Sequence, residues 1–123
     1  MSQRTRKVSE AIKEVVAEIL PGLKDPRIGF VTVTDVRTTP DLSSAEIFFT
    51  VLPDDPEVLA ATEKGLASAT PLVRREVGSA LQMRRVPDLH FTHDPLPEHS
   101  RRIETLLQDA RGSEEDDVDD ADR

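Results

Sequence analysis

The sequence contains no cysteine, tryptophan or tyrosine, and it has only four phenylalanines. Without cysteine, thiol redox chemistry and thiolate metal sites are excluded. Few aromatic rings disfavour base recognition by stacking, so any contact with nucleic acid would be mainly electrostatic. No apolar run approaches the ~20 residues of a membrane-spanning helix, and the opening residues MSQRTRKVSE lack the apolar region of a signal peptide. We therefore expect a soluble, cytoplasmic protein.

Signatures of catalysis are also missing. The sequence has no P-loop, no glycine-rich dinucleotide fingerprint, no HExxH and no GxSxG, and its acidic residues do not form an isolated pair between apolar segments. Three histidines, His90, His93 and His99, could suggest a metal site, but they are divided between a predicted strand and a proline-rich loop. We expect no catalytic residues, no metal ligands and no cofactor.

The charge is unevenly distributed along the chain. The formal net charge of the 123 residues is −8. Residues 112–123 hold seven acids and one arginine, a net charge of −6, which leaves −2 for residues 1–111. An acidic run with so few apolar residues cannot offset its ordering entropy, so we predict one folded domain over residues 1–111 and a disordered acidic tail over 112–123.

The apolar pattern predicts alternating helices and strands. One helical face carries Val8, Ile12, Val15, Val16 and Ile19, and this helix should end near Leu20, before Pro21-Gly22. Residues 30–36 and 44–52 alternate like strands and should pair as an antiparallel hairpin. Residues 82–92 predict a third strand, and residues 98–111 a short last helix. This order favours an α+β fold in which helices cover one face of a three-stranded sheet.

Residues 56–80 form the most informative stretch. A single apolar stripe runs along it, made of Leu59, Leu66, Ala69, Val73, Val77 and Ala80. Pro71 has no N–H and disfavours a helical Thr70, whereas Thr70 can cap the start of a new helix. We therefore predict a helix–kink–helix with a break at Ala69, Thr70 and Pro71, which a continuous helix over 57–80 would contradict.

Four short motifs resemble the ribosome-binding factor A family, bacterial assembly factors of the small ribosomal subunit. They are RTRKV at 4–8, KDPRIG at 24–29, DLSSA at 41–45 and VPDLHF at 86–91 with Asp94, in order over residues 4–108. The resemblance implies a type II KH-like fold (α-β-β-α-kink-α-β) without the GxxG loop. It also implies a non-catalytic protein that binds ribosomal RNA of the immature small subunit near the decoding-region helices, with a role in late maturation and cold adaptation.

One departure concerns the kink. The family usually has Ala-x-Gly there, and this chain has Ala69-Thr70-Pro71. Proline also breaks helices, but glycine allows RNA to approach the backbone more closely.

Clustered basic residues are the candidates for RNA binding: Arg4, Arg6, Lys7, Lys24, Arg27, Lys64, Arg74, Arg75, Arg84 and Arg85. Two interpretations remain open for them. Arg74, Arg75, Arg84 and Arg85 either contact RNA phosphates or form a solvated face paired with Glu76 and Asp88. Lys24 and Arg27 either extend the RNA surface or belong to a structured turn in which Asp25 accepts backbone N–H bonds.

Two further alternatives concern partners. The acidic tail either keeps the protein soluble or competes with RNA for the basic residues. The whole domain could instead be a protein-interaction module that uses the open face or edge of its sheet. Strong salt dependence of binding would favour RNA over such a module. In either case we expect a monomer.

Overall fold

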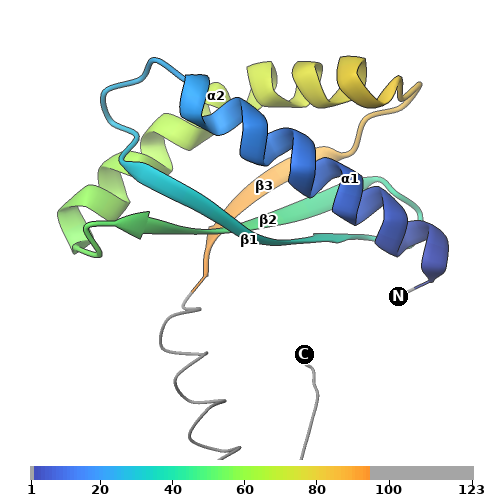
Figure 1. Ribbon diagram of the computed structural model, residues 1–123, viewed down its shortest axis with the longest axis horizontal. Coiled ribbons are helices and arrows are strands. Elements are labelled where there is room, and N and C mark those ends of the chain that lie inside the picture. Colours follow the sequence, from blue (N-terminus) through green and yellow to red (C-terminus); the bar gives the residue numbers. More distant parts are fainter. Residues whose placement is uncertain (1, 95–123) are drawn as a thin grey trace, which may run out of the picture.

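The computed structural model describes residues 2–94, and its elements follow the predicted order. They are α1 (Gln3–Ile19), a 3₁₀ turn η1 (Leu20–Gly22), β1 (Phe30–Thr38), β2 (Ser44–Leu52), α2 (Pro56–Leu81) and β3 (Asp88–His93). The sheet order is β1-β2-β3, with β1 antiparallel and β3 parallel to β2. Both helices cover the same face of the sheet, and the other face is left open by the described residues (Figure 1). The predicted α+β, KH-like architecture is confirmed.

Helix α1 begins and ends as its sequence indicates. Ser2 caps its start by accepting a hydrogen bond from the Thr5 N–H. Ile12 and Val16 are fully buried against the sheet. The α-helix ends at Ile19, and Pro21 lies in the tight turn that follows.

A β-bulge in β1 was not foreseen. The pairing with β2 shifts between Val33 and Asp35. The extra residue changes the phase of the strand, so Val36 and Thr38 become its buried positions. In β2 the alternation is regular, and Ala45, Ile47, Phe49 and Val51 are buried as predicted.

The predicted break in the second helix is wrong. Helix α2 is continuous from Pro56 to Leu81 with Pro71 inside it. Thr70 does not cap a new helix, because its hydroxyl donates to the Leu66 carbonyl one turn earlier, at 2.8 Å. Such back-bonding is typical of bent helices, and the two halves of α2 run in different directions (Figure 1). Pro71 thus bends the helix without ending it.

Two further predictions are wrong, one for the last core residue of α2 and one for the first residue of β3. Ala80 is exposed, whereas Leu81 packs against the core, because the 3.6-residue period carries the buried stripe from Val73 and Val77 to Leu81. The third strand starts at Asp88 instead of residue 82, since Gln82 has left-handed backbone (φ 52°) and caps the end of α2. Pro87 immediately precedes this edge strand, a place where a missing N–H is tolerated.

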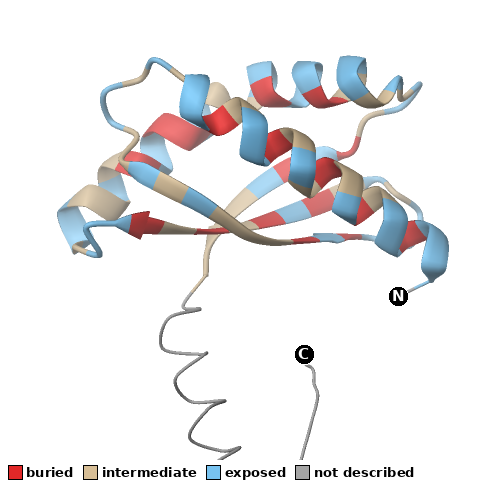
Figure 2. Cartoon of the chain, viewed as in Figure 1, coloured by how far each residue is buried: buried red, intermediate tan, exposed pale blue. Residues whose placement is uncertain are grey.

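The core lies between the helices and the sheet (Figure 2). Its members are Ile12, Val16, Leu20, Val36, Ala45, Ile47, Phe49, Leu66, Val73, Val77 and Leu89. The predicted helix over 98–111 and the predicted disorder of 112–123 lie outside the described residues.

Candidate nucleic-acid interface

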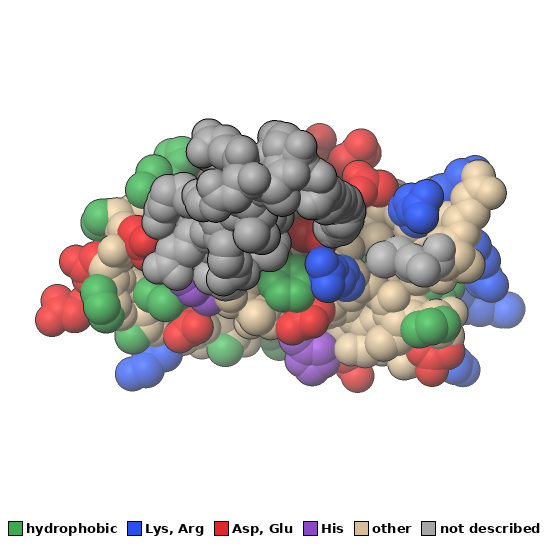
Figure 3. Space-filling view, turned by 90° about the horizontal axis from the view of Figure 1, so that it is seen from below, with side chains coloured by type: hydrophobic (Ala, Val, Ile, Leu, Met, Phe, Trp, Pro, Cys, Tyr) green, Lys and Arg blue, Asp and Glu red, His purple; other side chains and the backbone are tan. Residues whose placement is uncertain are grey.

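Five of the predicted basic residues lie at one end of the molecule. Arg4, Arg6 and Lys7 are exposed on the first turns of α1, and Arg84 and Arg85 are exposed between α2 and β3. Both segments lie at the end of the long axis where the chain begins (Figure 1). Lys and Arg side chains gather at this end on the face seen in Figure 3. We call these five residues the basic end.

Buried polar contacts hold the segments of the basic end together. The buried Ser9 hydroxyl of α1 lies 2.8 Å from the hydroxyl of Thr38 at the end of β1. The hairpin between β1 and β2 is tied to β3 in turn, because the Asp88 N–H donates to the Ser43 carbonyl at 3.0 Å. The first turns of α1 and the start of β3 therefore belong to one rigid end of the fold.

The hairpin at this end has its own hydrogen-bond network. Asp41 accepts bonds from the hydroxyls of Ser43 and Thr39 and from the Ser43 N–H. These bonds, led by the one from the Ser43 hydroxyl, lower the pKa of the Asp41 carboxyl. They hold Leu42 in left-handed backbone, with φ 63°. The DLSSA motif is thus accounted for by turn structure.

Lys64 lies far from Lys24 and Arg27 in the sequence, but the loop before β1 connects the two places. The Gly29 N–H of this loop donates to the buried Thr62 hydroxyl of α2 at 3.0 Å. Ile28 packs so closely on Gly65 that a Cβ there would lie 2.5 Å from the Ile28 Cγ1. The loop that carries Lys24 and Arg27 is therefore anchored beside the turn of α2 that carries Lys64.

Arg27 is engaged within its own loop. Its guanidinium donates to both carboxylate oxygens of Asp25, at 3.0 and 2.6 Å, and its backbone N–H donates to one of them at 2.9 Å. These bonds, above all those from the guanidinium, lower the pKa of the Asp25 carboxyl from 3.8 to about 2. The structured-turn interpretation is confirmed for Asp25. Lys24 and Arg27 are both exposed, but of the two only Arg27 has an ion pair within residues 2–94.

The two adjacent arginines of α2 differ in their contacts. Arg74 donates to the backbone carbonyls of Val86 and Pro87 and lies 3.7 Å from the Asp88 carboxylate. Arg75 is exposed, and it makes no hydrogen bond or ion pair through its side chain within residues 2–94. The paired-face interpretation thus applies to Arg74 through Asp88.

The bend of α2 is reachable from solvent. Pro71 is exposed, and Ala69 and Thr70 are partly exposed. At the bend the Thr70 hydroxyl is occupied by the Leu66 carbonyl.

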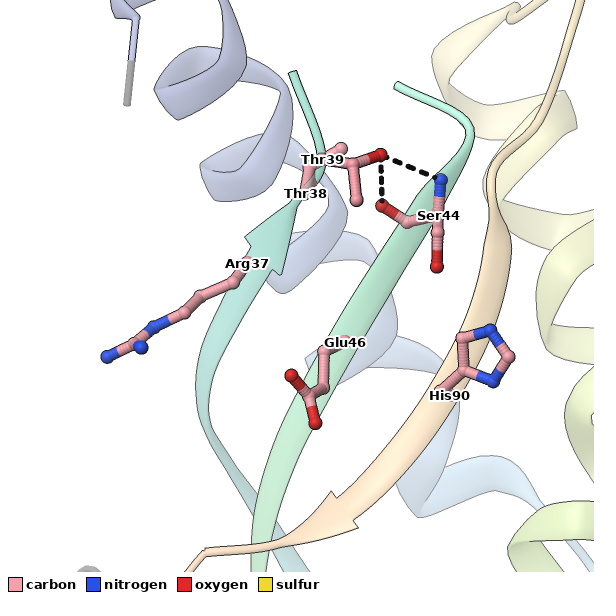
Figure 4. Close-up of a pocket in the computed structure, with 6 residues that line it drawn as sticks. All are labelled: Arg37, Thr38, Thr39, Ser44, Glu46 and His90. Carbon is pink, nitrogen blue, oxygen red and sulfur yellow. Dashed lines mark hydrogen bonds between the residues drawn. The ribbon is translucent and has the colours of Figure 1, made fainter. Parts of the chain in front are cut away.

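The open face of the sheet carries mixed charges and a shallow hollow of about 300 Å³. Figure 4 shows its lining residues, Arg37, Thr38, Thr39, Ser44, Glu46 and His90. Arg37 was not among the predicted residues; it lies 5.5 Å from the Phe48 ring centroid and pairs with Asp35 at 3.4 Å. Because Asp35 pairs with Arg37 and Glu46 lines the same hollow, this face has no excess of positive charge for phosphates.

The histidines do not form a metal site in the part of the chain that the structure describes. His90 is exposed, and the His93 ring packs edge-on against Phe49. Residues 2–94 contain no group of three or more potential ligands. His99 lies beyond them.

Among residues 2–94, no helix is long and apolar enough to cross a membrane.

Comparison with known proteins decides the family. The model of the family described as ribosome-binding factor A matches residues 4–107, which is most of the chain. The chain belongs to the ribosome-binding factor A family. Ribosome-binding factor A of Geotalea daltonii is 48% identical over 120 residues, which cover 97% of each protein.

Solved structures of family members have the same fold. A solution NMR structure of a putative ribosome-binding factor A from Thermotoga maritima superposes with a TM-score of 0.67, at 26% identity, over 75% of this chain and 88% of that one. A homology model of Thermus thermophilus ribosome-binding factor A, fitted into a cryo-EM map of a 30S complex of that protein, gives a TM-score of 0.58 at 26% identity, over 67% and 86% of the two chains. The matched residues 4–107 include every candidate basic residue.

Proposed function

We propose that this protein is a non-catalytic assembly factor that binds ribosomal RNA in the free or immature small subunit and assists its late maturation. The observation that carries the proposal is the basic end, found on a chain of the ribosome-binding factor A family. The 30S complex of the Thermus relative supports the small subunit as the partner. Roles in rRNA processing and cold adaptation, a cytoplasmic location and a monomeric state belong to the same proposal.

The charges and the scarcity of aromatic rings favour a particular kind of RNA binding. Arginine and lysine contacts to phosphates supply affinity without reading base sequence. Specificity must then come from the shape of an RNA junction that fits the rigid end of the protein. Such a protein acts by binding one RNA arrangement better than others and so shifting the population toward it.

The alternative is a protein-interaction module that uses the open sheet face. Its supporting observation is an exposed apolar pair, Phe30 and Leu52, which face each other across β1 and β2 with 71% and 64% of their surface exposed. Apolar contacts of this kind weaken little with salt.

Co-sedimentation with purified ribosomal particles over a salt series separates the two functions. We expect selective binding to free small subunits, with the logarithm of the affinity falling linearly with the logarithm of salt concentration. Replacing Arg84 and Arg85 together by Gln should lower the slope by about 0.7–0.9 for each phosphate that the variant no longer neutralises. Arg37→Gln, on the open face, is the matched control and should leave the slope unchanged.

The opposite pattern would favour the protein-interaction module. Binding that hardly changes with salt, and that disappears on replacing Phe30 and Leu52 by Ser but persists in the arginine variant, would refute direct RNA binding.

A further inference from the structure

The segment between α2 and β3 is held at both of its ends. Gln82 caps the helix in left-handed backbone, and the Met83 N–H donates to the Gly78 carbonyl at 3.0 Å. Val86 packs on Gly78 so closely that a Cβ at residue 78 would lie 2.6 Å from the Val86 Cγ2. Pro87 is fully buried, and the Asp88 N–H donates to Ser43. These contacts tie both ends of the segment to α2 and to the β1–β2 hairpin.

Arg84 and Arg85 are the exceptions in this segment. Both are exposed, and neither makes a hydrogen bond or ion pair within residues 2–94. They therefore project from a backbone that is held on both sides, at Met83 and at Val86, with their guanidinium groups available to a ligand. Preorganisation of this kind lowers the entropy cost of binding.

Arg74 of α2 holds the end of this segment through its side chain. Its Nε donates to the Pro87 carbonyl at 3.1 Å and its Nη2 to the Val86 carbonyl at 2.7 Å, while the Asp88 carboxylate lies 3.7 Å from Nε. These two carbonyls follow the exposed arginine pair directly. The planar guanidinium fork suits two adjacent acceptors, which a lysine ammonium cannot reproduce with the same geometry. Two of the five guanidinium N–H donors of Arg74 are thus committed to backbone carbonyls.

We propose that Arg74 is a positioning residue, which fixes the Arg84–Arg85 pair for phosphate binding and does not itself bind RNA. The inference rests on the proposed function, because it assigns the pair to the RNA surface. It also gives Arg74 a different role from Arg84 and Arg85, since Arg74 shapes the site and the other two bind.

The first test measures order in the free protein. Backbone ¹⁵N order parameters of Arg84, Arg85 and Val86 should be about 0.85 in the unaltered protein and fall below about 0.6 in Arg74→Lys and Arg74→Gln. The neighbouring substitutions Arg75→Lys and Arg75→Gln are the matched controls and should leave these values unchanged. Circular dichroism and thermal unfolding establish that each variant is folded.

The second test measures binding to free small subunits by co-sedimentation at one low salt concentration. Arg74→Lys keeps the charge but loses the fork, so we expect about a tenfold loss of affinity from the disordered pair. In a variant that combines Arg74→Lys with Arg84→Gln and Arg85→Gln, the loss of affinity should be smaller than the sum of the separate losses. The reason is that an arginine pair that is no longer held in place already contributes little to binding. Gly78→Ala, which displaces Val86 without removing any charge, should weaken binding in the same way.

The outcomes separate the claims. Unchanged order parameters in both Arg74 variants would overturn the positioning role, whether or not RNA binds. Retained affinity in Arg74→Lys, or additive losses in the combined variant, would overturn the claim that Arg74 acts through the Arg84–Arg85 pair. If the unaltered protein fails to bind small subunits, the proposed function is overturned, and the order parameters still decide whether Arg74 holds the segment.

Discussion

Asp25 shows how a single side chain organises a loop that is open to solvent. Its carboxylate receives three hydrogen bonds from Arg27, and further along the chain Ile28 and Gly29 attach the loop to α2. The KDPRIG motif therefore combines a local turn with two tertiary anchors. The structure thus gives Asp25, Ile28 and Gly29 of this motif a role in holding the loop.

Asp25 predicts a dependence of stability on pH. Because its pKa is lowered from 3.8 to about 2 in the folded protein, its contribution to stability is fully present above the unfolded value and is lost as the pH falls through about 2. The difference in unfolding free energy between the unaltered protein and Asp25→Asn should be constant above about pH 5 and shrink between about pH 4 and 2. Urea unfolding at each pH measures it, and an Asp25 carboxyl that titrates near 3.8 by NMR would contradict the expectation.

Gly65 predicts an effect that opposes helix propensity. In the interior of a helix, Gly→Ala normally stabilises by about 1 kcal/mol. At Gly65 the new methyl would lie 2.5 Å from the Ile28 Cγ1, and overpacking of this kind costs about 1–3 kcal/mol. We expect Gly65→Ala to lower the free energy of unfolding by roughly 1 kcal/mol in urea titrations.

Two comparisons control for this effect. Gly22→Ala has no atom within 4 Å of the new Cβ and should not destabilise the protein by contact. In an Ile28→Ala background the penalty of Gly65→Ala should shrink or change sign. An equal penalty in both backgrounds would show that Ile28 is not its cause.

Helix α2 illustrates how an element can keep its continuity through a proline. Pro71 cannot donate to the carbonyl four residues earlier, and the Thr70 hydroxyl donates to the Leu66 carbonyl at the same turn. Leu66 before the bend and Val73 and Val77 after it are all fully buried. The bend therefore keeps both halves of α2 packed on the core, whereas a straight helix of this length would point away from it at one end.

Pro71→Ala tests the balance between propensity and packing in α2. Proline in a helix interior costs about 3 kcal/mol, so its removal should stabilise the helix. Straightening would strain the packing of Val73 and Val77, so we expect a net gain in unfolding free energy of only about 1 kcal/mol. Chemical denaturation measures the gain. A net loss of stability would mean that the packing free energy lost on straightening exceeds the helix propensity gained by removing the proline.

The molecule as a whole separates its charges along its length and along its sequence. The basic end lies at one end of the long axis, while residues 112–123 carry a net charge of −6. In a chain with a net charge of −8, RNA binding depends on this segregation and not on the total. The same segregation gives the acidic residues a basic surface to compete for.

Deletion of residues 112–123 tests whether they compete with RNA. Competition predicts tighter binding of the shortened chain to free small subunits at low salt, with the advantage disappearing as salt screens the attraction. Co-sedimentation of both chains over the same salt series measures it. Equal affinities at low salt would leave the acidic residues with a solubilising role.

Much of this fold could be predicted from the sequence because its signals are local. The apolar periodicity of α1, the alternation in β2 and the cap provided by Asp55 to the Glu57 and Val58 N–H groups each depend on neighbouring residues alone. The candidate site was predictable only as a set of cations. Residue type reveals charge, but not which guanidinium is already hydrogen-bonded.

Contacts between distant residues decided the rest. The bulge in β1, the continuity of α2 through Pro71, and the close approach of Ile28 to Gly65 and of Val86 to Gly78 depend on how the elements pack. The same is true of Arg74, which resembles Arg75 in sequence and differs from it because the Val86 and Pro87 carbonyls lie within its reach. Local sequence determined the elements and their charges, whereas tertiary packing determined which charges are free to bind, because a hydrogen bond requires its partner to be in place.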